Sequence, residues 1–113
     1  MTIPDDFKNA FELLQNKIHK TAKSKGWWDD TRNDGELIAL MHSEVSEALE
    51  ALRAGNPPDD KIPEFSGLEA ELADVIIRIM DMAEARKLNV AGAILAKTDF
   101  NTGRKHKHGG KAF

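Results

Sequence analysis

Hydrophobic residues recur along this chain with the period of an α-helix, in four separate segments. In the first segment, apolar residues at every third or fourth position predict a helix that begins near Asp5 or Asp6 and ends near Gly26. An aspartate side chain can cap the first turn, and glycine readily ends a helix. The apolar face of this predicted helix carries Phe7, Phe11, Leu14, Ile18 and Ala22.

Three further segments repeat the helical pattern. They span about 36–54, 68–87 and 90–102. Ser66 is the expected N-cap of the third predicted helix, because Glu69 follows three residues later and completes a capping box. Gly103 is expected to end the last helix. No segment alternates apolar and polar residues as a β-strand does, so the pattern predicts an all-α fold.

The connections differ in composition from the predicted helices. Residues 26–35 contain two glycines and several Asn and Asp residues, which is typical of a loop. Residues 55–67 are rich in proline, glycine and acidic residues. We expect this second stretch to be an exposed and mobile connection.

The third predicted helix is apolar on more than one side. One stripe consists of Leu68, Leu72, Val75, Ile79 and Met82. Ile77 lies on the opposite side, and Ile76 and Met80 widen the coverage. A helix that is apolar nearly all round must be buried nearly all round, and four short helices cannot cover it alone. We therefore expect the chain to associate with itself as a homo-oligomer, with this helix in the interface between subunits.

Two acidic motifs of the same form lie in the second and third predicted helices. Glu44 and Glu47 are three residues apart, as are Glu71 and Asp74. Residues at this spacing share a helix face, so two facing helices could gather four carboxylates. On a helical wheel Glu44 falls within the apolar stripe of its own helix, where an unpaired carboxylate is costly.

Four anions held close together repel one another unless a cation lies among them. All-oxygen ligands favour Mg²⁺, with Mn²⁺ as a substitute. Neither motif ends in the histidine of an E-x-x-H di-iron site, and the chain has no cysteine for a thiolate zinc site. The acidic motifs thus predict a magnesium site. The alternative is that they are ordinary solvated acids, with Arg78 as an ion-pair partner.

Length and composition narrow the class of protein. A chain of 113 residues is expected to form one domain, 1–113, with a basic tail from about residue 103. The absence of cysteine excludes a disulfide scaffold and a cysteine nucleophile. We see neither a secretion signal nor an apolar run long enough to span a bilayer, so we expect a cytoplasmic protein without a membrane partner. The net charge of -3 argues against a nucleic-acid-binding protein.

Basic and amide residues near the C-terminus form a second candidate site. Lys97, Asn101 and Arg104 follow one another at i, i+4 and i+7, and Lys107 lies just beyond. Lys and Arg neutralise phosphate oxygens and Asn adds a donor, so these residues are suited to bind a polyphosphate. The alternative is a solvated basic terminus that complements the helix dipole.

Aromatic residues gather where the first predicted helix meets its loop. His19, Trp27 and Trp28 lie there, and the chain has no other tryptophan. Such rings can stack on a nucleobase. The alternative is a tryptophan of the core and a histidine of the surface.

Taken together, these residues resemble the MazG-type all-α nucleoside triphosphate pyrophosphohydrolases. The resemblance runs from about Ile18 to Lys111, through the stretches LIALMHSEVSEALEALR, ELADVIIRIMDMAE and KTDFNTGRKHKHGGK. The last stretch resembles the compact single-domain MazG-like proteins in particular. The resemblance implies a four-helix MazG-like bundle whose subunits associate through helices into a dimer or a dimer of dimers.

The resemblance also implies hydrolysis of a (deoxy)nucleoside triphosphate to the monophosphate and pyrophosphate, in cleansing or control of the nucleotide pool. The implied metal ligands are Glu44, Glu47, Glu71 and Asp74. The implied phosphate-binding residues are Lys97, Asn101 and Arg104. His19 and Trp28 match the residues that sandwich the base in related dCTP pyrophosphatases. A further tryptophan of those relatives, just after the first acidic motif, is absent from residues 51–53.

We expect water to attack the α-phosphate directly, because the chain has no cysteine nucleophile and no Ser–His–Asp arrangement. Glu47 is the residue expected to orient or deprotonate that water, with Glu44 as the second catalytic carboxylate. One alternative is another pyrophosphohydrolase of the same superfamily, acting on phosphoribosyl-ATP or dUTP. The other is a non-catalytic helical module that binds nucleotides or another protein.

Overall fold

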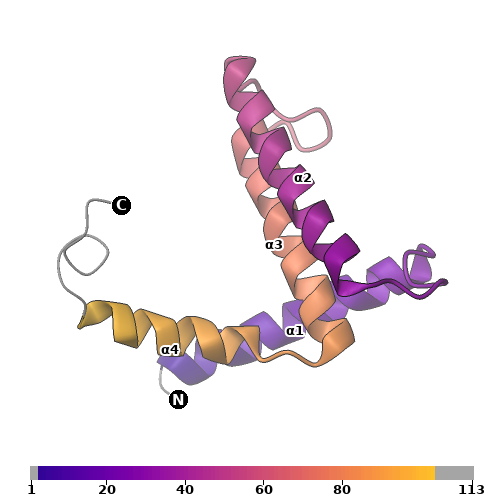
Figure 1. Cartoon of the computed structure of the whole chain (residues 1–113). Coiled ribbons are helices and arrows are strands. Elements are labelled where there is room, and N and C mark those ends of the chain that lie inside the picture. The colour runs from indigo at the N-terminus through magenta and orange to yellow at the C-terminus, as the bar shows by residue number, and fades with distance from the viewer. Residues whose placement is uncertain (1–2, 104–113) are drawn as a thin grey trace. The chain divides into compact units, whose positions relative to one another are not determined.

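The computed structural model describes residues 3–103 and is all-helical in that range (Figure 1). Its helices are α1 (Ile3–Ser24), α2 (Asp34–Arg53), α3 (Gly67–Arg86) and α4 (Val90–Thr102). The described residues contain no β-strand, only an isolated bridge between Pro58 and Ser66. The predicted all-α class and its four helices are confirmed. No helix in residues 3–103 is long and apolar enough to cross a membrane.

The chain divides into two compact units. The larger unit is Gln15–Leu88, which holds the second half of α1 and all of α2 and α3. The smaller unit holds the described residues 3–14 and 89–103, which are the first half of α1 and α4. Within the larger unit α2 and α3 lie side by side and run in opposite directions (Figure 1). This hairpin carries both acidic motifs.

Local side-chain hydrogen bonds set the starts of α2 and α3. The predicted capping box at α3 is confirmed: Ser66 accepts from the Glu69 backbone N–H, and Glu69 accepts from the Ser66 backbone N–H. The side chain of Asn33 accepts from the Glu36 backbone N–H, so α2 begins at Asp34, two residues before the predicted start.

The predicted start of α1 was wrong. The helix begins at Ile3, so Asp5 and Asp6 lie in its first turn and neither is the N-cap. Pro4 also fits this first turn, because its missing N–H would have no helical partner there. The aspartates still favour the helix start, since their charge complements the positive end of the helix dipole.

The connection between α2 and α3 is exposed, as predicted, and is held by its own hydrogen bonds. The side chain of Asn56 accepts from the Leu68 backbone N–H at 2.8 Å. The carboxylate of Asp59 accepts from two backbone N–H groups, those of Lys61 and Ile62. These bonds fix the path of a segment whose composition suggested an irregular loop.

The buried core of the larger unit is small. Its buried apolar residues are Leu37, Ala48, Ala70, Met80 and Ala83. Alanines at these positions allow the α2 and α3 backbones to approach closely. Leu72, Ile76 and Ile77 on α3 remain 43–53% exposed in the single chain. These side chains give α3 an apolar surface in the single chain.

Candidate metal centre and ring cluster

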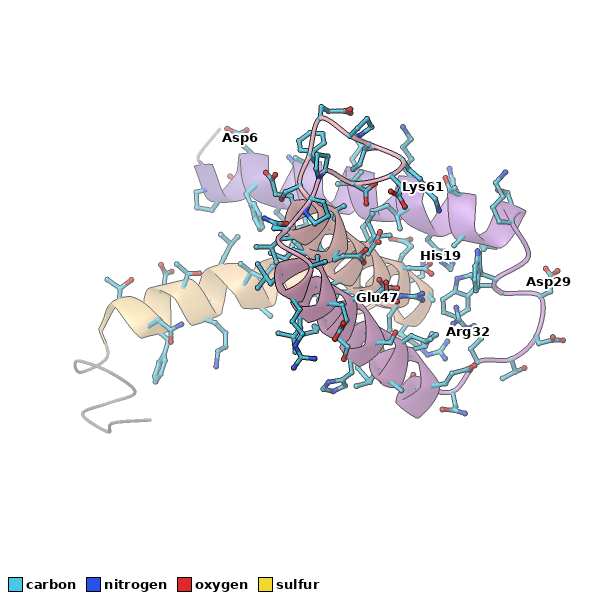
Figure 2. All side chains as sticks on the ribbon, turned by 90° about the horizontal axis from the view of Figure 1, so that it is seen from above. Asp6, His19, Asp29, Arg32, Glu47 and Lys61 are labelled. Atoms are coloured by element: carbon cyan, nitrogen blue, oxygen red, sulfur yellow. The ribbon has the colours of Figure 1, made fainter. Side chains whose placement is uncertain are left out.

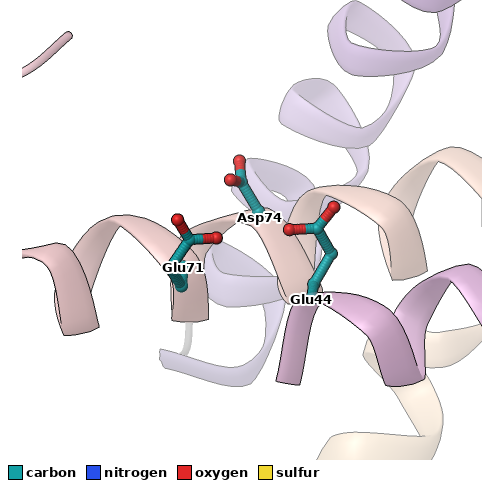
Figure 3. Close-up of side chains that lie close together, drawn as sticks. All are labelled: Glu44, Glu71 and Asp74. Carbon is teal, nitrogen blue, oxygen red and sulfur yellow. The ribbon is translucent and has the colours of Figure 1, made fainter. Parts of the chain in front are cut away.

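Three carboxylates from α2 and α3 converge at one point, which we call the acidic cluster: Glu44, Glu71 and Asp74. One oxygen from each residue lies within 4.8 Å of an oxygen of each of the others. Figure 3 shows the three groups turned toward one another, Glu44 from α2 and the other two from α3. The antiparallel hairpin causes this meeting, because it sets the faces that carry the two motifs against each other.

The acidic cluster is crowded with negative charge. Burial raises the pKa of Glu71, and the neighbouring charges of Asp74, Glu47 and Glu44 raise it further. Burial also raises the pKa of Asp74, with a further contribution from Glu44. Both shifts mean that the folded chain resists placing another negative charge here, and a bound cation would relieve that resistance.

Arg78 already balances part of this charge. Its Nε donates to Oε1 of Glu44 at 2.9 Å, and the Glu44 side chain is only 15% exposed. The Arg78 charge also counteracts the rise in the pKa of Asp74. The ion pair anticipated as the alternative interpretation is thus present beside the convergence of carboxylates, and both features belong to the same site.

Glu47 lies at the margin of the acidic cluster. Its side chain is exposed, and it is not one of the three groups that converge. Its charge nevertheless contributes to the raised pKa of Glu71. The structure therefore brings three of the four predicted metal ligands together and leaves the fourth beside them.

The connection between α2 and α3 adds two charges that the sequence analysis missed. The charge of Asp59 raises the pKa of Asp74, and the charge of Lys61 lowers it. Lys61 is exposed in the connection (Figure 2). No spacing rule links residues in such a loop to a helix position, so the sequence offered no signal for either residue.

His19 and Trp28 both lie within hydrogen-bonding distance of Asp81, a carboxylate of α3 outside the acidic cluster. Nδ1 of His19 lies 2.7 Å from Oδ1 of Asp81, and Nε1 of Trp28 donates to both oxygens of Asp81 at 3.0 and 3.1 Å. The two rings contact each other edge to face, with centroids 5.2 Å apart. We call these three residues the ring cluster. Sequence reasoning found the rings but not Asp81.

The predicted phosphate-binding residues are only partly described. Lys97 and Asn101 are exposed and one turn apart on α4, within the smaller unit, whereas the acidic cluster belongs to the larger one. Arg104 and Lys107 lie outside the described residues.

Comparisons with known proteins leave the family open. No family model matches the chain, and no solved structure matches it. Among curated proteins, the chain is similar to subunit 4 of the vacuolar transporter chaperone complex of Schizosaccharomyces pombe, with 28% identity over 100 residues. The match covers 87% of this chain but only 13% of that protein.

Proposed function

We propose that this chain is a magnesium-dependent nucleoside triphosphate pyrophosphohydrolase of the MazG-like type. The observation that carries the proposal is the acidic cluster, in which Glu44, Glu71 and Asp74 from two helices converge within 4.8 Å. The raised pKa values of Glu71 and Asp74 support it, because burial and, after it, the neighbouring negative charges disfavour the ionised carboxylates at that point.

The donor set fits a hard divalent cation. Each of the three groups offers carboxylate oxygen, the ligand that magnesium and manganese prefer, and no sulfur or imidazole lies among them. A bound magnesium ion would neutralise negative charge on the substrate phosphates and so favour attack at phosphorus. Magnesium-carboxylate sites commonly serve phosphate substrates, which is the link from this cluster to a nucleotide.

The remaining roles follow from position and charge. Glu47, exposed beside the acidic cluster, would take a proton from the water that attacks the α-phosphate. Lys97 and Asn101, with Arg104 and Lys107 in the sequence beyond them, would hold the β- and γ-phosphates. His19 and Trp28 would contact the base.

The apolar surface of α2 and α3 supports self-association as part of this function. Val45, Leu49 and Leu52 are 48–52% exposed in the single chain. Similar residues on α3 extend this surface, and burying them would contribute roughly 25 cal/mol for each Å² removed from water. A homodimer or homotetramer would supply that cover.

The direct test is the identity of the products. The full chain would be incubated with magnesium and a panel of ribo- and deoxyribonucleoside triphosphates, and pyrophosphate and orthophosphate would be measured separately. We expect pyrophosphate and the monophosphate in equal amounts. Orthophosphate as the sole product would mean cleavage at the γ-phosphate and would overturn the proposal.

A second candidate function is favoured by the Glu44–Arg78 ion pair. Since Arg78 partly neutralises the acidic cluster without any metal, the hairpin could serve a non-catalytic module that binds a nucleotide or a protein. Calorimetry with nucleotide, in the presence and absence of magnesium, separates the two. Tight binding that needs no magnesium, with no turnover in any metal, would support the binding module instead.

A further inference from the structure

Asp81 is a carboxylate of α3 that lies in the larger unit, outside the acidic cluster. One Asp81 side chain accepts hydrogen bonds from two different rings, His19 of α1 and Trp28 of the connection after it. The side chains of His19 and Asp81 are 16% and 15% exposed, so water competes little for these bonds. Hydrogen bonds to a charged acceptor in such a setting are stronger than neutral ones.

Two arginines also lie close to the Trp28 ring. The guanidinium carbons of Arg32 and Arg86 lie 5.1 and 5.6 Å from the ring centroid, close enough for cation–π attraction. Arg86 also donates to the Arg32 carbonyl oxygen and to the carboxylate of Asp34. Figure 2 labels His19 and Arg32, both of which contact the Trp28 ring.

The bond to Asp81 also decides which nitrogen of His19 carries the proton in the neutral ring. An ionised carboxylate only accepts, so Nδ1 of His19 carries the proton that is shared with Asp81. In the neutral imidazole the acceptor is then Nε2. Among residues 3–103, Nε2 has no hydrogen-bond partner, which leaves it able to accept from an N–H group of a ligand.

We propose that Asp81 is a positioning residue that holds His19 and Trp28 as one rigid surface for a nucleobase. This proposal rests on the proposed function, since it takes the ligand to be a nucleotide. Asp81 fixes the indole by its N–H and fixes the imidazole tautomer. It therefore acts on base recognition through the two rings, without touching substrate and without contributing to the acidic cluster.

The chain contains a matched control for this role. Glu84 lies one turn beyond Asp81 on α3 and likewise links α3 to α1, because it accepts a hydrogen bond from Gln15 at 3.2 Å. Among residues 3–103 Glu84 has no hydrogen bond or ion pair with either ring, and it also pairs with Lys87 at 3.3 Å. Glu84→Gln thus tests whether any α1–α3 link has the same effect, whereas Asp81→Asn and Asp81→Ala test the ring surface.

The experiment measures kcat and KM for each nucleoside triphosphate, together with magnesium affinity by calorimetry. In Asp81→Ala we expect KM for the preferred nucleotide to rise about ten-fold, the scale of one hydrogen bond to a charged group. The differences in KM among bases should shrink. We expect kcat and magnesium affinity to stay within about two-fold of wild type, because the lost interaction is made equally in the ground state and the transition state. Asp81→Asn should be intermediate, and Glu84→Gln should match wild type.

A structural readout keeps the test decisive if Asp81→Ala folds poorly. The indole N–H resonance of Trp28, assigned with a Trp27→Phe variant, should shift upfield in Asp81→Asn as its hydrogen bond weakens. A shifted resonance with unchanged KM and base ranking would overturn the positioning role. Equal effects of Asp81→Asn and Glu84→Gln would do the same, since they would indicate a general loss of packing.

Failure of the proposed function can be recognised separately. Nucleosides lack phosphates, so their binding, followed by the Trp28 and His19 resonances, does not depend on hydrolysis. Nucleoside binding that is lost in Asp81→Asn would support the positioning role even if no triphosphate were hydrolysed. A wild-type chain that binds no nucleoside at these rings would overturn the role, whatever the acidic cluster does.

Discussion

α3 contributes carboxylates to two clusters, the acidic cluster and the ring cluster, and the two differ in how the carboxylate charge is balanced. In the acidic cluster, Glu71 and Asp74 meet Glu44 of α2, and the pKa values of Glu71 and Asp74 are raised. In the ring cluster, one carboxylate, Asp81, meets two N–H donors. The first arrangement sets three carboxylates against one donating arginine, Arg78, whereas in the second the donors and the acceptor are matched. We propose a cation for the first arrangement, and a supporting role toward other side chains for the second.

The largest expected effect is on activity at the acidic cluster. Glu44→Gln and Asp74→Asn remove a charge while nearly preserving shape, and should each lower kcat/KM by about a thousand-fold or more, roughly 4 kcal/mol of transition-state stabilisation. Pyrophosphate release measures this, and circular dichroism checks that the helices remain. The control is Glu50→Gln, because Glu50 is 69% exposed and its ion pair, with Arg53, lies within its own helix. Wild-type turnover in Asp74→Asn would mean that the acidic cluster is not the catalytic site.

The next effect is on stability at the ring cluster. Asp81→Ala leaves the half-buried N–H groups of His19 and Trp28 without their acceptor and should lower the free energy of unfolding by about 2 kcal/mol. Urea unfolding measures the change. Glu50→Gln again serves as the comparison and should change stability by less than about 0.5 kcal/mol. A neutral result for Asp81→Ala would show that the donors find other partners.

Stabilisation of the folded chain by magnesium should depend on the acidic cluster and not on the ring cluster. At about ten times its Kd, magnesium should stabilise the wild-type chain by about 1.4 kcal/mol, because it binds the folded state only. Thermal unfolding with and without magnesium measures this shift. Asp74→Asn should lose the shift, and Asp81→Asn should keep it. An equal shift in wild type and Asp74→Asn would place the ion elsewhere.

A smaller effect of opposite sign is expected for Glu71→Gln without metal. Removing a charge from a crowded, partly exposed cluster should raise the free energy of unfolding by roughly 0.5 kcal/mol. The corresponding rise in Tm is about 2–4 °C. The same change should abolish stabilisation by magnesium. A destabilised Glu71→Gln would mean that this carboxylate is already well paired in the folded chain.

The smallest effect is a dependence of stability on pH. The pKa values of Glu71 and Asp74 are raised in the folded state, so the folded chain binds more protons than the unfolded chain between the ordinary and the raised values. The contribution of these two carboxyl groups to stability should therefore be greatest below the ordinary carboxyl pKa and should fall as the pH rises through that window. Saturating magnesium should flatten this slope. Urea midpoints measured from pH 4 to 7 would detect it, with Glu71→Gln as the reference.

The helices were predictable because their signals are local. The capping box of Ser66 and Glu69 and the stop at Gly103 depend only on neighbours in sequence, and both are confirmed. The errors were local as well. α1 starts before Asp5 because Pro4 suits the first turn, and α2 starts early because Asn33 caps it.

The candidate site was predictable only where helix periodicity reached it. The i, i+3 spacing placed Glu71 and Asp74 on one face, and the apolar stripe drew attention to Glu44. The same spacing also predicted Glu47 as a metal ligand, yet its side chain is exposed at the margin of the acidic cluster. Nothing in the sequence pointed to Asp81, because a single aspartate in a helix is expected to be a surface residue until its partners are known.

The sequence alone determined the all-α class, the four helical segments and the two acidic motifs, since periodicity and capping act over a few residues. The tertiary structure decided which carboxylates meet. Glu44 and Asp74 are thirty positions apart, and Trp28 and Asp81 more than fifty. Whether such residues repel, coordinate or hydrogen-bond depends on how α1, α2 and α3 pack within Gln15–Leu88, and the strength of these interactions depends on the water that packing removes.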